Sequence, residues 1–245
     1  MQAADVIGTG RLGRALGAWL GAAGWRLDTV VSRDGARARR LARRWGARHG
    51  LALRRYEGGS PLVFLAVPDD QLAGLAVALA SGAGVWRNKV ILHGSGALSA
   101  AVLAPLRGRG AAVGSLHPLM TFARGGVPSP AGVVCAIEGD PAARRLAGRL
   151  VAGWGGLPLP LRASQKTQYH LAAMFVSPLA VVDFALATEQ LRRAGLGPAA
   201  LRRAAAGLQR LLAQTAANLA PGDERALAAA WTGPLARGDR RTERR

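Results

Sequence analysis

A short strand, a glycine-rich turn and an amphipathic helix follow one another at the start of this chain, and few folds accommodate that order. Residues 3–7 read as a short buried strand, and residues 12–23 place apolar side chains at helical spacing. The turn between them reads Gly8-Thr9-Gly10-Arg11-Leu12-Gly13. A strand that passes through such a turn into a helix is typical of a parallel βαβ unit.

The spacing of the three glycines matches the G-x-G-x-x-G pattern of dinucleotide-binding sites. In that pattern Gly8 permits the tight turn, Gly10 lets the backbone approach a pyrophosphate, and Gly13 allows the helix to pack closely on the strand. The helix N-terminus adds amide donors and a positive dipole. A plain glycine-rich turn is the alternative, but the strand–turn–helix context favours a cofactor site. The expected cofactor-binding residues of the turn are Gly8, Thr9, Gly10, Arg11, Leu12 and Gly13.

The end of the second strand, about 20 residues further on, indicates which dinucleotide is bound. NAD sites carry an Asp or Glu there, which binds the ribose hydroxyls. This chain has Ser32 and Arg33, which offer a hydroxyl and a guanidinium to a 2′-phosphate, and its first carboxylate is Asp34. We therefore expect NADP, although Ser32 is also placed to cap the next helix. Val67 and Pro68, where a buried strand ends, complete the expected cofactor site.

Apolar runs of strand length alternate with helical patterns up to about residue 161, as in the continuous run over residues 62–67. This alternation predicts an α/β fold, with an N-terminal doubly wound Rossmann-type sheet over residues 1–161. Asp69 or Asp70 is expected to cap the helix after residue 68.

From residue 162 the pattern is helical only, which predicts an all-α C-terminal domain over residues 162–245. Its first helix carries apolar residues on nearly every side and must be buried against something, so we expect a homodimer. The predicted helices cover residues 164–194, with a break at Pro178, then 199–219 and 223–231.

The net charge of +19 raises the question of nucleic-acid binding. The positive residues are nearly all arginines, spread among Ala and Gly, and no aromatic residues alternate with them as a stacking surface would require. The two local clusters, residues 37–44 and 237–245, are expected to be a solvated helix face and a frayed tail. We therefore expect no nucleic-acid partner.

The chain shows no long uncharged apolar segment and no signal peptide at its start, so we expect no membrane span and a cytoplasmic protein. The single cysteine, Cys135, lies in an apolar run and is expected to be a small buried hydrophobe.

Together these motifs resemble those of the bacterial Rossmann-like proteins that carry a C-terminal domain of unknown function 2520. Those proteins are similar to pyrroline-5-carboxylate reductase, deazaflavin-dependent NADP oxidoreductase and the β-hydroxyacid dehydrogenases. The resemblance implies a Rossmann fold and an NADP cofactor, and no particular substrate. It rests on residues 8–13 with 32–33, 63–70, 93–96 with 116–118, 166–170, and 232–239. The chain departs from the family where Val176-Ser177-Pro178 lacks an Asn, and its C-terminal domain is shorter than expected.

The resemblance also implies catalytic residues. Ser95 corresponds to a substrate-binding serine of the β-hydroxyacid dehydrogenases, and Lys166 to a lysine that contacts their substrate. Lys166 and His170 lie four apart on one helix face, with Tyr169 at its flank. Lys166 is one of only two lysines in a chain that otherwise uses Arg, which suggests that a titratable amine is needed there. The fifth candidate is His117, which follows a strand.

We expect Lys166 to donate a proton while His170 or Tyr169 orients the substrate. The alternatives are that Ser95 is an ordinary turn serine and that Lys166 and His170 only bridge two parts of the fold. The histidine spacing matches no compact metal site, and the G-x-S-x-G pattern of serine hydrolases is absent. Two functions remain: an NADP-dependent oxidoreductase acting on a small polar, anionic substrate, or a non-catalytic dinucleotide-binding protein.

Overall fold

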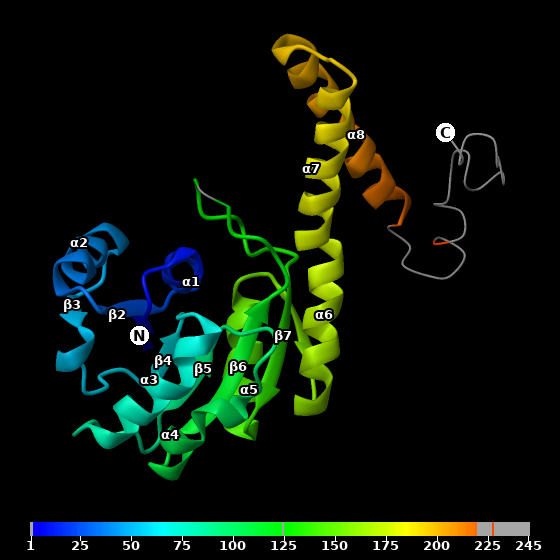
Figure 1. Ribbon diagram of the computed structural model, residues 1–245. Coiled ribbons are helices and arrows are strands. Elements are labelled where there is room, and N and C mark those ends of the chain that lie inside the picture. The colour runs from blue at the N-terminus through cyan, green and yellow to red at the C-terminus, as the bar shows by residue number, and fades with distance from the viewer. Residues whose placement is uncertain (1, 124, 220–226, 228–245) are drawn as a thin grey trace. The chain divides into compact units, whose positions relative to one another are not determined.

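The computed structural model describes residues 2–123, 125–219 and 227, and these form two compact units (Figure 1). Unit 1 extends to Phe175 and contains the sheet, and unit 2 begins at Val176 and is helical. The predicted order of a doubly wound sheet followed by helices is confirmed. Unit 1 runs past the predicted boundary at residue 161 because the following helix is anchored to the sheet through Lys166.

The sheet of unit 1 has eight strands in the order β3-β2-β1-β4-β5-β6-β7-β8. All neighbouring strands are parallel except β6 and β7, which are antiparallel. The chain runs outward from β1 to β3 and then returns to place β4 on the other side of β1, so the carboxyl ends of β1 and β4 form the switch point where such sheets bind ligands. The strands are β1 (Ala3–Ile7), β2 (Arg26–Ser32), β3 (His49–Ala52), β4 (Leu62–Leu65), β5 (Val90–His93), β6 (Ala112–Pro118), β7 (Val134–Gly139) and β8 (Leu157–Pro160).

Helices cover both faces of the sheet, and each face has its own apolar core. On one face Val6 packs with side chains of α1, α2 and α5, and on the other Ile7 packs with side chains of α3 and α4. The alternation of β1 side chains between the two cores is the two-residue period of a strand. The helices of unit 1 are α1 (Arg11–Ala22), α2 (Gly35–Trp45), α3 (Asp69–Ser81), α4 (Ala104–Gly108), α5 (Pro141–Gly153) and α6 (Lys166–Val176), with short 3-10 turns at Leu53–Arg55, Ala100–Leu103 and Ala163–Gln165.

The capping prediction for α3 is wrong, and so is the alternative interpretation of Ser32 as a helix cap. Neither Asp69 nor Asp70 caps α3, because its N-cap position is Pro68 and the Asp69 side chain bonds elsewhere. Ser32 does not cap α2 either, since Asp34 occupies the N-cap position and accepts a hydrogen bond from the Ala36 N–H at 2.8 Å. Both errors have a consequence for the site, because they leave Asp69 and Ser32 free for other partners.

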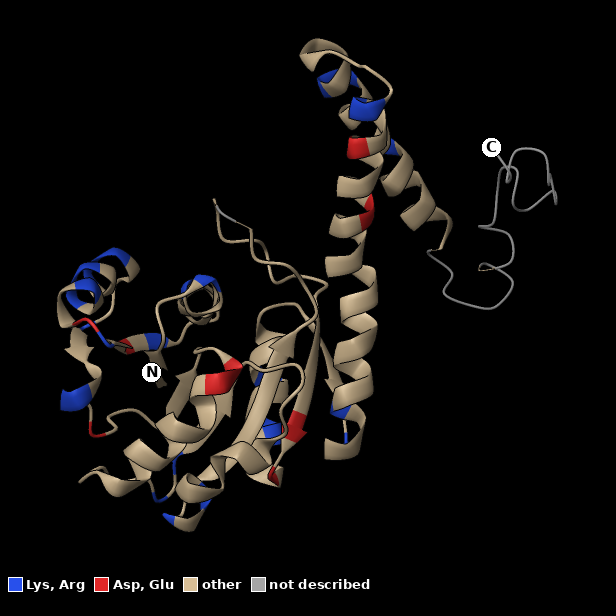
Figure 2. Cartoon of the chain, in the orientation of Figure 1, with Lys and Arg blue, Asp and Glu red and all other residues tan. Residues whose placement is uncertain are grey.

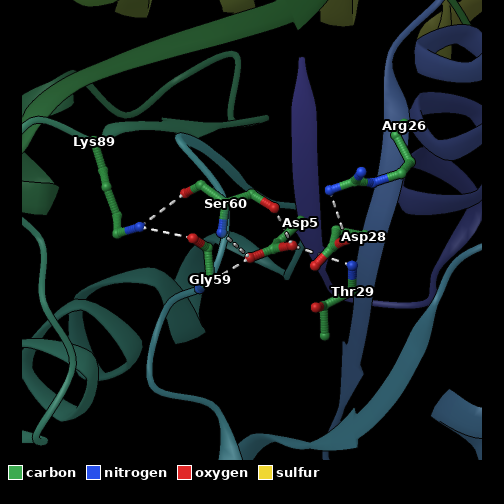
Figure 3. Close-up of polar contacts among 7 residues, drawn as sticks. All are labelled: Asp5, Arg26, Asp28, Thr29, Gly59, Ser60 and Lys89. Carbon is green, nitrogen blue, oxygen red and sulfur yellow. Dashed lines mark hydrogen bonds and ion pairs between the residues drawn. The ribbon is translucent and has the colours of Figure 1, made fainter. Parts of the chain in front are cut away.

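A buried carboxylate ties the middle of the sheet to the segment before β4 (Figure 3). Asp5 is fully enclosed, and its Oδ1 accepts from the Thr29 N–H (3.1 Å) and the Ser60 hydroxyl (2.7 Å). Its Oδ2 accepts from the Tyr56 hydroxyl (2.7 Å), the Gly59 N–H (3.3 Å) and the Ser60 N–H (2.9 Å). A buried carboxylate with this many donors is fully satisfied.

The basic residues of unit 1 are distributed over several elements in Figure 2, among them α1, α2 and α4, rather than gathered on one. Cys135 is buried as predicted, and burial raises the pKa of its thiol to about 12. An inert buried thiol agrees with its apolar sequence context.

Unit 2 contains α7 (Pro178–Arg193) and α8 (Pro198–Asn218), which are joined by a turn at Gly195, where φ is +83°. The predicted break at Pro178 is confirmed, because α6 ends at Val176 and Pro178 begins α7. Neither α7 nor α8 has a buried residue, and Val181 is 69% exposed. The helix predicted over residues 223–231, apart from residue 227, and the motif at residues 232–239 lie outside the described residues.

One helical stretch, Ala163–Arg193, is long and apolar enough to cross a membrane, judged by length and composition alone. No such segment was expected from the sequence. A helix that packs against another protein surface has the same composition.

Candidate active site

The glycine-rich turn holds the ends of β1, α1 and β4 together by close backbone contact. Gly8 has a φ of +111°, and a Cβ on it would lie 2.2 Å from the Ala66 carbonyl oxygen. A Cβ on Gly13 would lie 2.1 Å from the Gly8 carbonyl oxygen, whereas one on Gly10 would meet nothing within 4 Å. The first and third glycines therefore permit packing, and the second leaves open space beside the helix N-terminus, where a phosphate group fits.

A groove of about 650 Å³ runs along this turn and across the ends of β2 and β4. Its volume lies in the range of small-molecule sites. Of the predicted cofactor residues it brings together Gly8, Thr9, Gly10, Ser32, Arg33, Val67 and Pro68. The open space at Gly10, the free amides of α1 and the groove fit a dinucleotide.

Three predicted cofactor residues do not line this groove. Leu12 packs against the apolar core, and Gly13 is buried against Gly8. Arg11 faces a neighbouring cavity of about 300 Å³, and its guanidinium donates to the Phe122 carbonyl oxygen at 3.2 Å. The side chain of Arg11 thus holds the segment between β6 and β7 against α1.

Arg37 is a groove residue that the sequence analysis assigned to a solvated face. It lies in the first turn of α2, lines the groove and donates from Nη2 to the Thr9 carbonyl oxygen at 3.2 Å. No local pattern marks this contact, because it joins residues 28 positions apart in the chain.

The five predicted catalytic residues lie in one cluster at the carboxyl ends of β5 and β6. Lys166 is its buried centre, with 1% of its surface exposed. Its ammonium donates to the Ser95 carbonyl oxygen at 2.8 Å and to the Ser115 hydroxyl at 2.7 Å. Burial lowers the pKa of Lys166 to about 8, and the charges of Glu138 and Asp69 oppose part of that decrease.

Ser95 is held from several sides. Its hydroxyl donates to Asp69 Oδ2 at 2.6 Å and accepts from the Ala97 and Leu98 N–H groups at 3.2 and 2.9 Å. Its own N–H donates to Nδ1 of His93 at 3.2 Å. Burial, with a smaller effect of the Lys166 charge, lowers the pKa of His93 to about 3, so this imidazole is neutral, and its hydrogen bonds shape the loop after β5.

Three aromatic rings complete the cluster. The Tyr169 hydroxyl and His117 Nδ1 are 3.0 Å apart, and the His117 and His170 rings meet edge to face with centroids 6.1 Å apart. Gly96 permits this approach, because a Cβ there would lie 2.6 Å from His170 Nδ1 and 2.9 Å from His117 Nε2. His170 Nδ1 is buried without a hydrogen-bond partner among the described residues. A buried polar atom without a partner is uncommon in folded proteins and is typical of a functional site or of a bound water.

Protonation states follow from burial. It is the main cause that lowers the pKa of His117 to about 4, with the charges of Lys166 and His170 adding to the decrease. Burial raises the pKa of Tyr169 to about 12. At neutral pH the cluster therefore contains a neutral His117, a protonated Tyr169 and a largely protonated Lys166. In the hydrogen-bonded pair of Tyr169 and His117, the proton therefore stays on the tyrosine hydroxyl.

Asp69 and Ser115 belong to the cluster and were not among the predicted site residues. Asp69 was interpreted as a helix cap, and Ser115 lies inside a strand without any distinguishing pattern. Only the three-dimensional structure brings them to Ser95 and Lys166. Within the described residues no three His, Cys, Asp or Glu side chains group as metal ligands.

Two protein-family models together cover most of the chain. The Rossmann-like domain matches residues 2–118, and the domain of unknown function 2520 matches residues 133–245. The resemblance predicted from sequence is thereby confirmed. No curated protein matches the sequence.

Solved structures share the fold over most of the chain. A proposed NADP oxidoreductase from Bacteroides fragilis matches with a TM-score of 0.79 and 22% identity, over 98% of this chain and 88% of that one. A protein from Thermotoga maritima matches with a TM-score of 0.73 and 25% identity, over 96% and 85%. A reductive aminase from Aspergillus terreus, in complex with NADPH and ethyl-5-oxohexanoate, matches with a TM-score of 0.63 and 22% identity, over 91% and 78%.

Proposed function

Because the chain is a Rossmann-like protein with a C-terminal domain of unknown function 2520, we propose that it is an NADP-dependent oxidoreductase acting on a small polar substrate. The bound cofactor would supply or accept a hydride. The observation that carries the proposal is the continuity of groove and cluster. Pro68 lines the groove, and the next residue, Asp69, accepts a hydrogen bond from Ser95. A cofactor in the groove would therefore lie beside side chains that can bind a second molecule.

The groove favours the phosphorylated dinucleotide. Ser32, Arg33 and Arg37 line it at the end of β2, where a 2′-phosphate would lie, and guanidinium groups pair well with phosphate. The nearest carboxylate, Asp34, caps α2. The names of two structural relatives, an NADP oxidoreductase and an aminase solved with NADPH, agree with this preference.

Calorimetric titration with NADPH and NADH tests the preference. We expect NADPH to bind at least about tenfold more tightly, because a charge-assisted hydrogen bond contributes about 1.5–3 kcal/mol. Arg33→Asp should weaken NADPH binding by about tenfold or more and leave NADH binding nearly unchanged. Arg40→Asp is the control, since Arg40 is exposed on α2 and does not line the groove. Equal or tighter binding of NADH by the native protein would contradict the proposal.

The cluster suggests how its residues divide the work. The Lys166 ammonium is enclosed and bonded to protein oxygens, a geometry closer to the bridging alternative than to direct proton donation. In our proposal Lys166 is a positioning residue that fixes Ser95 and the loop around it. Tyr169 and His170, both half-exposed, contact the substrate, and His117 orients the Tyr169 hydroxyl. Tyr169 is then the group that hydrogen-bonds the reacting oxygen or nitrogen.

Oxidation of NADPH in the presence of small ketones and imines distinguishes an enzyme from a non-catalytic binding protein. Turnover that Tyr169→Phe reduces by about tenfold or more, the effect of losing one hydrogen bond of about 1.4 kcal/mol to the reacting atom, would support the proposed roles. Tight NADPH binding with no turnover on any carbonyl or imine compound would favour the non-catalytic alternative.

We also propose that the protein is a cytoplasmic homodimer. The exposed apolar side chains of α6 and α7, among them Phe175 at 60% and Val176 at 77% exposure, support a protein partner for these helices. Exposed apolar surface of this extent is typical of subunit interfaces.

A further inference from the structure

Asp69 is a carboxylate between the groove and the substrate cluster. The residue before it, Pro68, lines the groove, and its own Oδ2 accepts from the Ser95 hydroxyl at 2.6 Å. The side chain does not cap α3, and its Oδ1 accepts no hydrogen bond from the described residues. Half of this exposed carboxylate therefore remains available to a ligand.

Among the residues that the structure describes, Asp69 forms no ion pair. The ion pairs among the described residues join Arg26 to Asp28, Arg107 to Asp140, and Glu189 to Arg192 and Arg193. Lys166 is the nearby positive charge that acts on Asp69, but it forms no direct ion pair with it. An exposed carboxylate without a direct ion pair at the edge of a binding site attracts cations and repels anions.

The other titratable groups of the cluster do not reverse this charge at its surface. Lys166 is enclosed, so its ammonium cannot meet a ligand directly. His117 and His93 are neutral at pH 7. Glu138 is buried, with Oε2 accepting from the Ala100 N–H at 2.7 Å, and adds a second negative charge behind the cluster.

From this placement we infer that Asp69 determines specificity, selecting substrates whose reacting group is a cation: a protonated imine in one direction and an ammonium in the other. The inference rests on the proposed function and replaces the anionic substrate expected from the sequence. A ketone is disfavoured at this position, because its reduction develops negative charge on oxygen beside the carboxylate.

Reduction of a protonated imine does not require a proton from the enclosed Lys166. When hydride adds to the imine carbon, a C–H bond forms and the π electrons of the C=N bond become the nitrogen lone pair. The product is a neutral amine, which water protonates after the reaction. In the opposite direction the bound ammonium first gives this proton to water, and the neutral amine then releases the hydride. No side chain has to supply a proton during the hydride step, so Lys166 can remain bonded to Ser95 and Ser115.

Binding of three ring compounds to the NADP⁺-loaded protein tests the inference without turnover. Pyrrolidine is a cation at neutral pH, cyclopentanol is its neutral counterpart, and cyclopentanecarboxylate is the anion. We expect pyrrolidinium to bind at least about tenfold more tightly than either of the others, which corresponds to about 1.4 kcal/mol. Asp69→Asn should remove that preference, because the amide keeps the hydrogen bond with Ser95 but carries no charge.

Asp70→Asn is the matched control. Asp70 is the next residue on the same helix turn, is also exposed and has no hydrogen-bond partner for its side chain among the described residues. It should leave pyrrolidinium binding within about twofold, and both variants should retain NADPH affinity and melting temperature.

Three results would overturn the inference. Pyrrolidinium could bind no more tightly than the other two compounds, or none of the three compounds could bind measurably. Asp69→Asn could bind it as the native protein does. Asp69→Asn could also weaken NADPH and pyrrolidinium to the same degree, which would make Asp69 a cofactor ligand. Failure of NADPH to bind the native protein would remove the proposed function and this inference together, whereas NADPH binding without charge selectivity would remove the inference alone.

Discussion

Replacement of Asp5 by Asn tests whether the buried carboxylate organises the sheet. Asp5 accepts five hydrogen bonds, three of them from backbone N–H groups that cannot turn away. An amide is nearly isosteric with a carboxylate, but only its oxygen can accept. With that oxygen in the place of Oδ2, the Thr29 N–H faces an NH₂ group and loses its partner.

The size of the effect follows from this geometry. Thr29 is buried, and an unsatisfied buried N–H costs about 1–3 kcal/mol. The remaining hydrogen bonds also lose their charge assistance, which contributes roughly a further 1 kcal/mol. The neutral amide recovers part of the cost of burying a charge. We therefore expect the free energy of unfolding to fall by about 2–3 kcal/mol.

Urea unfolding at neutral pH, followed by tryptophan fluorescence, measures this change, because Trp19, Trp86 and Trp154 are buried in unit 1. Ser60→Ala is the control. It removes one hydroxyl donor and leaves the carboxylate with four others, so it should cost about 1 kcal/mol. The free energy of unfolding of Asp5→Asn could lie within about 0.5 kcal/mol of the native value, the ordinary range for neutral surface changes. The argument that backbone N–H groups of fixed orientation need this carboxylate would then be wrong.

Four further predictions concern the cluster and the helices. Lys166→Met should leave NADPH affinity nearly unchanged and abolish turnover; full activity would exclude a role for this residue. Between the folded pKa of Lys166, about 8, and its unfolded value of 10.5, only the unfolded chain keeps the proton, so stability from this group rises with pH. Denaturation curves of the native protein and of Lys166→Met measure this effect. The difference between their free energies of unfolding, native minus variant, should rise by about 3 kcal/mol across that pH interval. A difference that stays constant or falls would refute the prediction. Gly96→Ala should lower both turnover and the free energy of unfolding, the latter by about 1–3 kcal/mol, because the new Cβ would collide with His170 and His117. NADPH binding measured by calorimetry should be unchanged. An unaffected melting temperature would show that the two rings move aside at little cost. Light scattering should give twice the 25.3 kDa mass of one chain, and Val181→Asp should reduce it to one; a native monomer at micromolar concentration would argue against the dimer.

Local sequence patterns predicted those parts of unit 1 that depend on local physics. The turn at residues 8–13, the strand that begins at Leu62 and the break at Pro178 each carry their own signal in glycine, apolar or proline content. Strand β3 was missed because His49-Gly50-Leu51-Ala52 is short and contains no β-branched residue, and its strand state depends on pairing with β2.

The predicted site residues fall into two groups. Lys166 was singled out by composition, as a lysine in an arginine-rich chain, and the structure places it at the centre of the cluster. Asp69 and Arg37 were assigned to a helix cap and a solvent-facing helix, which are their most frequent roles. Their contacts with Ser95 and Thr9 span 26 and 28 residues, and no local pattern encodes such pairings.

The close approach of Gly8 to Ala66 affects how the two ends of the site can change over evolution. The absence of a Cβ at Gly8 lets the glycine turn and the end of β4, which both line the groove, lie in direct contact. That part of the groove is made of main chain, so exchange of neighbouring side chains leaves its width intact and a dinucleotide would enter a preformed slot. The other end, from Asp69 to His170, is made of side chains, each replaceable by a single codon change. Descendants of such a protein can acquire new substrates while the position of the cofactor is inherited unchanged.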